Sequence, residues 1–258
     1  MVSGTTPINW VFLRGWARDA RHWHDFPEVF QTAFPDARVT LLDLSGNGSR
    51  WQQTSPSSVA DMVDDYRDQL KARSISGPVA LLAVSLGGMV ALEWGRRHPA
   101  EVACAVLVNS SVGQLSPLFH RLAPSAWMTL LSLAFSRDAH RIESGILRLI
   151  SNRDTRQLAK NWALYRQNQP TRLANAIRQL WAAGQYVAPS TIETPPMLVL
   201  ASQGDRMVNH RCSVRISEHY GWPLSLHSSA GHDLPLDDPH WMAMRIKDWL
   251  GPKTNRAR

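Results

Sequence analysis

The chain has 258 residues, 44% of them hydrophobic and 19% charged, which is the composition of an ordinary globular protein with room for a sizeable core. No apolar run approaches the roughly 18 to 20 residues of a membrane-spanning helix. The two cysteines, Cys104 and Cys212, lie far apart, which argues against a disulfide framework. Because the first residues also lack the pattern of a secretory signal, we expect a cytoplasmic protein.

Short apolar segments alternate with helical patterns along most of the chain. Continuous apolar runs such as VALLAV are typical of buried strands in a parallel sheet, and they predict strands at residues 8–14, 38–44, 79–84, 102–109, 197–202 and 224–228. Helical periodicity predicts helices at residues 58–73, 88–98, 211–220 and 238–250. The alternation indicates an α/β fold with a mainly parallel sheet covered by helices on both faces.

The alternation is interrupted between about Gln114 and Tyr186, where the pattern is helical throughout. We predict a helical insertion at residues 112–188 within a core domain formed by residues 1–111 and 189–258. The insertion follows the carboxyl end of a strand, which is where ligands bind in such sheets. It also holds the whole net charge of +7, since it has ten basic and three acidic residues while the rest of the chain has 18 of each. This asymmetry favours an anionic partner, but a solvated helical surface gives the same pattern.

The stretch LLAVSLGGMVALEW (residues 81–94) places one serine between a predicted strand and a predicted helix. Strand, sharp turn with serine and helix is the context of a nucleophile elbow, in which the serine hydroxyl stands above the sheet. Small residues two positions either side let strand and helix approach, and here they are Ala83 and Gly87. A serine in an ordinary β–α turn is the alternative. We therefore take Ser85 as the candidate nucleophile.

A serine nucleophile needs a base and an acid that orients the base. Asp205 follows the predicted strand MLVLAS, and His232 lies in the loop after the last predicted strand. The order Ser, Asp, His, with each residue at a strand end, is the order expected of this architecture. Asp233, Asp237 and Asp238 lie near the histidine but are better explained as loop and helix-cap residues. Residues 109–111, which follow another strand, include no acid.

Together these segments resemble the α/β-hydrolase superfamily over nearly the whole chain. Within that superfamily they resemble the small cap-bearing serine carboxylesterases. This group includes esterases that act on pimeloyl carrier protein. The motifs that carry the resemblance are LRGWARDARHW, LLDLSGNGSR, AVSLGG, GDRMV and AGHDLPLDDP. The resemblance implies an α/β-hydrolase fold with an inserted helical cap. It also implies an oxyanion hole formed by the backbone N–H groups of Leu86 and Trp16.

Two positions depart from the family pattern. Ala83 replaces the first glycine of the serine turn, which adds one methyl group. Arg14 replaces the histidine of the usual His-Gly pair of the oxyanion loop, the loop to which the resemblance assigns Trp16.

Some other features of the sequence have both a functional and a purely structural explanation. His22 and His24 resemble a metal-binding pair, but the sequence offers no third ligand cluster, and they are expected to open a helix near the oxyanion loop. Residues 125–135 (SAWMTLLSLAF) are either packing of the insertion or an acyl-chain site beneath it. Nucleic-acid binding is not expected, because no fold signature for it occurs.

We therefore expect a serine hydrolase that cleaves a small-molecule carboxylic ester through an acyl-enzyme, without cofactor or metal. The substrate is anionic or carrier-bound if the basic insertion is functional. The alternatives are a thioesterase, a carbon–carbon bond hydrolase with the same triad, and a non-catalytic binding protein on this fold.

Overall fold

A computed structural model describes residues 9–187 and 195–251. Its centre is a six-stranded sheet in the order β2-β1-β3-β4-β5-β6, in which every neighbouring pair is parallel. The strands are β1 (Asn9–Leu13), β2 (Arg38–Leu42), β3 (Val79–Val84), β4 (Val102–Val108), β5 (Met197–Ser202) and β6 (Leu224–His227). The predicted fold class is confirmed, and all six strands lie where the apolar runs place them. Within the described ranges, no helix is long and apolar enough to cross a bilayer.

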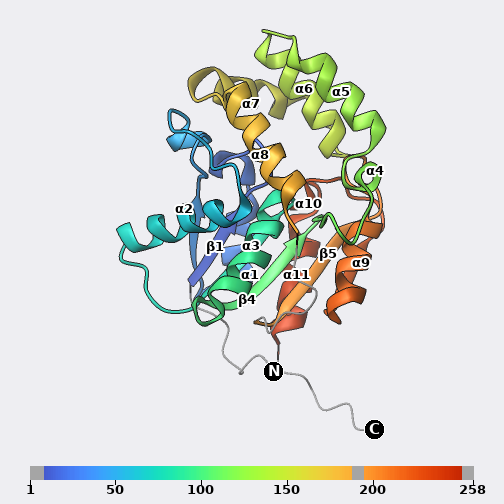
Figure 1. The fold of residues 1–258 in the computed structure, drawn as a ribbon. Coiled ribbons are helices and arrows are strands. Elements are labelled where there is room, and N and C mark those ends of the chain that lie inside the picture. Colours follow the sequence, from blue (N-terminus) through green and yellow to red (C-terminus); the bar gives the residue numbers. More distant parts are fainter. Residues whose placement is uncertain (1–8, 188–194, 252–258) are drawn as a thin grey trace.

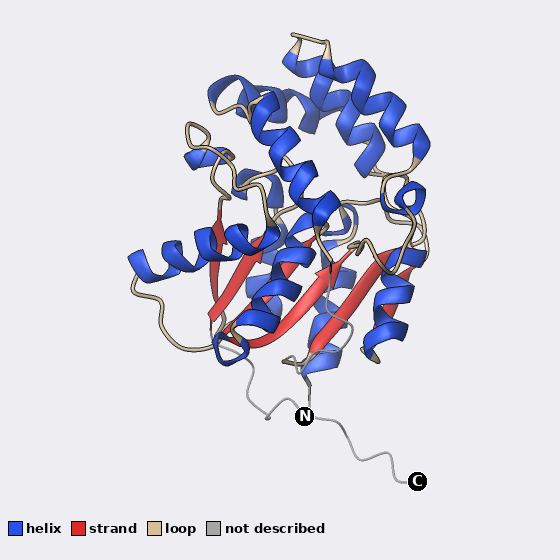
Figure 2. Cartoon of the chain, in the orientation of Figure 1, coloured by secondary structure: helices blue, strands red, loops and turns tan. Residues whose placement is uncertain are grey.

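Helices cover both faces of this sheet (Figure 2). One face packs against α2 (Val59–Ala72), α3 (Leu86–Arg97) and α9 (Arg211–Tyr220), and the other against α1 (Phe26–Ala33) and α11 (Pro239–Leu250). Shorter helical turns are η1 (Ala20–Trp23), η2 (Gly48–Arg50), η3 (Pro99–Glu101) and α10 (Leu234–Asp237). Ser58 caps α2 by accepting from the N–H of Asp61. Asp238 caps α11 by accepting from the N–H of Trp241, as the sequence predicts.

Five further helices form a layer above the sheet (Figure 1). We call them the cap helices: α4 (Leu118–Arg121), α5 (Pro124–Ala134), α6 (Ala139–Ile150), α7 (Arg156–Asn168) and α8 (Leu173–Gln185). Residues 114–186 contain no strand, in agreement with the sequence pattern. The expected domain boundary at residue 188 lies outside the described residues, so the division of the chain at that point stays a prediction.

Buried hydrogen bonds tie the cap helices to the loops at the top of the sheet. The indole N–H of Trp16 donates to the carbonyl of Ala176 (2.8 Å), and the side chain of Asn175 accepts from the N–H of Ser55 (3.0 Å). Gln179, which has no exposed surface, donates to the Ser55 hydroxyl (2.9 Å). Polar groups that are buried and paired in this way fix α8 over the core.

Of the two purposes expected for the apolar segment at residues 125–135, the structure shows packing within the cap, where Leu133 lies against Gly145 of α6. Helix α5 buries only Ala126 and Leu133, whereas Met128 and Phe135 are 70% and 84% exposed. No residue of α5 lines the cavity at Ser85. The cap contributes to that cavity through α6 instead.

Candidate active site

Ser85 lies in a strained turn between β3 and α3. Its backbone has φ 56° and ψ −115°, in the left-handed half of conformational space that residues other than glycine rarely adopt. Three hydrogen bonds hold this conformation. The N–H of Ser85 donates to the carbonyl of Val108 (2.8 Å), and its carbonyl accepts from the N–H of Gly88 and the hydroxyl of Ser110, both at 2.9 Å. The strain is therefore maintained by the end of β4, by Ser110 just beyond it and by the first turn of α3.

The two glycines after Ser85 are required by close packing. A Cβ atom on Gly87 would lie 2.6 Å from the carbonyl oxygen of Leu13, and one on Gly88 would lie 2.6 Å from the Ser110 hydroxyl oxygen. Both distances are too short for real contacts, so any side chain here would push α3 away from the end of β1. The Gly-Gly pair thus lets the helix begin directly after the serine.

Asp205 and His232 come together at the ends of β5 and β6. His232 Nδ1 lies 2.7 Å from Asp205 Oδ2, and both side chains are buried. The other carboxylate oxygen of Asp205 accepts from the N–H groups of Met207 (2.8 Å) and Val208 (2.9 Å). These three partners fix the carboxylate and leave Nε2 of the imidazole free to face another group.

The Asp205 carboxylate favours the charged form of His232. Burial opposes a positive charge on the imidazole, but the charge and hydrogen bond of Asp205, together with the charge of Asp233, outweigh burial and raise the pKa of His232. A carboxylate that stabilises an imidazolium in a buried site is the arrangement required of a proton-accepting base.

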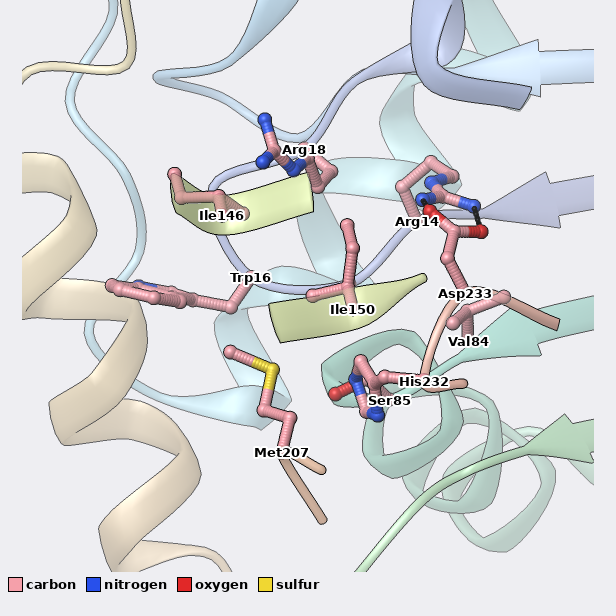
Figure 3. A pocket seen from close by; sticks show the side chains of 11 residues that line it. Arg14, Trp16, Arg18, Val84, Ser85, Ile146, Ile150, Met207, His232 and Asp233 are labelled. Atoms are coloured by element: carbon pink, nitrogen blue, oxygen red, sulfur yellow. Dashed lines mark hydrogen bonds and ion pairs between the residues drawn. The ribbon is translucent and has the colours of Figure 1, made fainter. Parts of the chain in front are cut away.

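Ser85 and His232 line a single cavity of about 40 Å³ (Figure 3). Trp16 from the loop after β1 lines it as well, and Ile146 and Ile150 of α6 close it from the cap side. Such a volume holds only a few water-sized groups, at roughly 10–15 Å³ each. The structure thus brings together three of the five residues that the sequence singles out.

The remaining two, Asp205 and Leu86, lie just outside the cavity lining. Asp205 contacts the imidazole of His232 from outside that lining. Leu86 is the first residue of α3, so its backbone N–H has no partner within the helix. In the described part of the chain, neither this N–H nor the backbone N–H of Trp16 donates to any acceptor.

Sequence reasoning missed a buried ion pair beside the site. Arg14 and Asp233, 5% and 2% exposed, form a two-pronged pair with N–O distances of 3.1 and 2.5 Å. Asp233 was expected only to shape its loop, and Arg14 only to depart from the family pattern. Instead the pair joins the loop that carries Trp16 to the loop that carries His232. The unusual arginine was the available signal, but its partner is 219 positions away.

Asn109 was set aside because it is no acid, yet it connects the two loops of the candidate triad. Its side chain accepts from the N–H of Ser202 (2.8 Å), at the end of β5, and donates to the carbonyl of His232 (2.9 Å). It is 1% exposed and has φ 46°. Asparagine tolerates this backbone conformation better than most residues, which explains its place at the end of β4.

The histidine pair at 22 and 24 is divided between two environments. His22 is buried, with its ring nitrogens 3.1 Å from the N–H nitrogen of Asp19 and 3.2 Å from Nη1 of Arg18. Burial and the charge of Arg18 lower the pKa of His22, which keeps the imidazole neutral. His24 is exposed beside Asp25. Among the described residues, no three His, Cys, Asp or Glu side chains form a group that could hold a metal ion.

Residues 10–245 match the sequence profile of the alpha/beta hydrolase family. The biotin biosynthesis bifunctional protein BioHC of Teredinibacter turnerae is 34% identical over 113 residues, which cover 42% of this chain and 17% of that protein. A pimeloyl-acyl-carrier-protein methyl ester esterase of Chromobacterium violaceum is 34% identical over 101 residues, covering 39% of this chain and 36% of the esterase. Both matches thus span well under half of the relatives' length.

Solved structures share the fold at lower identity. The esterase RhEst1 of Rhodococcus sp. ECU1013 superposes with a TM-score of 0.70 at 22% identity, covering 95% of this chain and 90% of the esterase. The parallel sheet, the turn that carries Ser85 and the helices that cover the sheet together define an α/β protein with the hydrolase fold. The profile match spans most of the chain, and the protein belongs to the alpha/beta hydrolase family. The likeness to these solved structures is a likeness of fold.

Proposed function

We propose that the protein is a serine hydrolase that cleaves carboxylic esters, with Ser85 as nucleophile, His232 as base and Asp205 as the orienting acid. The observation that carries the proposal is the cavity that Ser85 and His232 line together, with the Asp205 carboxylate 2.7 Å from His232 Nδ1. The strained turn at Ser85 supports it, because such strain is kept where function requires it.

In the proposed mechanism, the Ser85 hydroxyl oxygen attacks the ester carbonyl carbon while His232 Nε2 takes the hydroxyl proton. The N–H groups of Leu86 and Trp16 donate to the negative oxygen that develops, an effect worth about 3–4 kcal/mol for one donor. His232 then gives its proton to the departing alcohol. Water, activated in the same way, cleaves the acyl-enzyme and releases the carboxylic acid. No step needs a metal or a cofactor.

The cap helices suggest the nature of the substrate. Arg137, Arg141, Arg148, Arg153 and Arg156 are all exposed, and they belong to the segment that holds the net positive charge. The Chromobacterium violaceum relative acts on an acyl group attached to a carrier protein, as its name states. We propose that the cap helices attract an anionic or carrier-bound ester, in the cytoplasm as the sequence predicts.

The test is a panel of p-nitrophenyl esters of increasing acyl length. The wild-type protein should hydrolyse the shorter esters, and Ser85→Ala and His232→Ala should each lose nearly all activity while remaining folded. The double variant should lose little more, because residues that act as a unit are not additive. Near wild-type turnover by Ser85→Ala would contradict the proposal. Binding of esters without turnover by the wild type would favour a binding protein.

A further inference from the structure

Two buried arginines line the cavity beside Ser85, and each has an N–H group without a partner. Arg14 and Arg18 are 5% and 7% exposed. Nε of Arg14 and Nη2 of Arg18 have no hydrogen-bond acceptor among the described residues. A buried donor on a cation that lacks an acceptor is costly, so two of them at one cavity indicate a place for a ligand that accepts hydrogen bonds.

The charges in direct contact with Arg18 do not cancel, unlike those in contact with Arg14. Asp233 balances Arg14. Arg18, however, shares the carboxylate of Glu143 with Arg166, at N–O distances of 2.9 and 2.6 Å, and Glu143 is 1% exposed. Two cations and one anion leave one positive charge, in a region where water screens it weakly.

Neighbouring groups do not remove this excess. His22 beside Arg18 stays neutral, because burial and Arg18 lower its pKa. Two further buried acids do not pair with Arg18: Asp19 is held by Arg21 at 2.7 Å, and Asp205 contacts His232, which lies across the cavity from Arg18 in Figure 3. The ligand that suits the cavity is therefore an anion as well as an acceptor.

Arg18 is held in one orientation. Its guanidinium group lies over the ring of Trp162, 4.9 Å from the ring centre, and donates to Glu143 (2.9 Å). A planar guanidinium fixed in this way presents its remaining N–H groups with little loss of freedom on binding. Arg18 also lies two residues after Trp16, so one loop carries both the proposed oxyanion donor and the unpaired charge.

We propose that Arg18 binds a carboxylate on the substrate, so that the preferred substrate is a short ester whose acyl group ends in a second carboxylate. The inference rests on the proposed function. Because Arg18 and Ser85 line the same cavity, only a short acyl group can lie between the ester carbonyl and the distal carboxylate, as in a monoester of a dicarboxylic acid with three to five carbons. Figure 3 shows Arg18 on the side of the cavity opposite Ser85 and His232, where a distal carboxylate would lie.

The experiment compares two methyl esters of the same shape. Monomethyl succinate carries a carboxylate, and methyl succinamate carries a neutral amide in its place. The wild type should show kcat/KM at least about tenfold higher for the succinate ester, because a hydrogen bond to a charged group is worth about 1.5–3 kcal/mol and 1.4 kcal/mol is a factor of ten. Succinate should likewise inhibit hydrolysis of p-nitrophenyl acetate at lower concentration than succinamide, its neutral diamide.

Variants then locate the preference. In Arg18→Gln the ratio of the two kcat/KM values should fall to about one, and Arg18→Lys, which keeps the charge, should retain part of it. General damage to the site lowers both rates and cancels in the ratio. The matched control is Ile146→Ala, which alters the lining of the same cavity without changing charge and should preserve the ratio within about twofold.

Equal kcat/KM values for the two esters in the wild type would overturn the inference, as would an unchanged ratio in Arg18→Gln. The wild type could also hydrolyse p-nitrophenyl acetate in a reaction that requires Ser85 and yet hydrolyse neither methyl ester. That result would overturn the inference about Arg18 and leave the proposed function intact. If Arg18→Gln does not fold, the comparison of wild-type inhibition by succinate and by succinamide decides the question: equal inhibition by the two would overturn the inference. Activity that survives Ser85→Ala would instead remove the proposed function.

Discussion

The buried pair of Arg14 and Asp233 gives the most demanding prediction. Asp233→Asn keeps the shape of the side chain but removes its charge, which leaves the guanidinium of Arg14 buried without a counter-ion. Arg14 also stacks on Trp23, with 4.8 Å between the guanidinium carbon and the ring centre, so it has no simple route to solvent. The variant therefore tests whether this pair holds the two loops of the site together.

The size of the effect follows from burial. The side chains of Arg14 and Asp233 are 4% and 2% exposed, and removal of one partner from such a pair costs about 3–5 kcal/mol of the free energy of unfolding. For a chain of this size, the melting temperature should fall by roughly 6–20 °C. The double variant Arg14→Met with Asp233→Leu should recover most of this loss, because a well-packed apolar pair replaces a buried ion pair at little cost.

Thermal and urea unfolding of the wild type, Asp233→Asn and the double variant measure these differences in stability. The pH profile of kcat/KM gives a second readout. Asp233→Asn should lower the kinetic pKa of His232, because Asp233 raises it and Arg14 lowers it. The matched control is Asp154→Asn, which breaks the exposed pair with Arg156 and should leave the melting temperature unchanged. If the double variant is no more stable than Asp233→Asn, the reasoning is wrong.

Three further predictions concern catalysis. Asp205→Asn should lower kcat by several orders of magnitude with a modest change in KM, since the carboxylate acts on the imidazolium formed during the reaction. If Asp205→Asn is nearly as active as the wild type and Asp237→Asn is inactive, the orienting acid is Asp237 and not Asp205. In the wild type, kcat/KM should rise with pH through a pKa above about 6.5, because His232 must be neutral to accept a proton and its pKa is raised. A rise in kcat/KM with a kinetic pKa below that value would contradict this. Charge reversal of two or three cap arginines should lower kcat/KM severalfold for an anionic ester at low salt but not for a neutral ester. Charge reversal of Arg38 and Lys247, which are exposed on the core domain, provides the control. Equal losses on both esters would indicate damaged packing. The arginines to reverse are Arg137, Arg141, Arg148, Arg153 and Arg156.

The sheet could be predicted from the sequence because local patterns determine it. The runs VALLAV and VACAVLV have no polar face, so they must be buried on both sides, and parallel strands with helical crossovers are the structure that provides such burial. The residues that end each strand then lie at one edge of the sheet. This is why Ser85, Asp205 and His232 could be singled out before any distance was known.

Contacts between distant segments could not be predicted in the same way. Arg18 and Glu143 are 125 positions apart, and no local pattern states that a cap residue will neutralise an arginine of the loop after β1. The outward face of α5 was missed for a related reason. An apolar helix in the sequence implies burial, whereas here Met128 and Phe135 face outward.

The central claim is that the hydroxyl of Ser85 is an activated nucleophile, and reaction with a fluorophosphonate followed by mass spectrometry of the digested protein tests it most directly. The account predicts one covalent adduct for each chain, located on Ser85, and a large loss of labelling in His232→Ala. Ser85→Ala should remain folded and unlabelled. A folded wild-type protein that does not react, or an adduct on a different serine, would contradict the account.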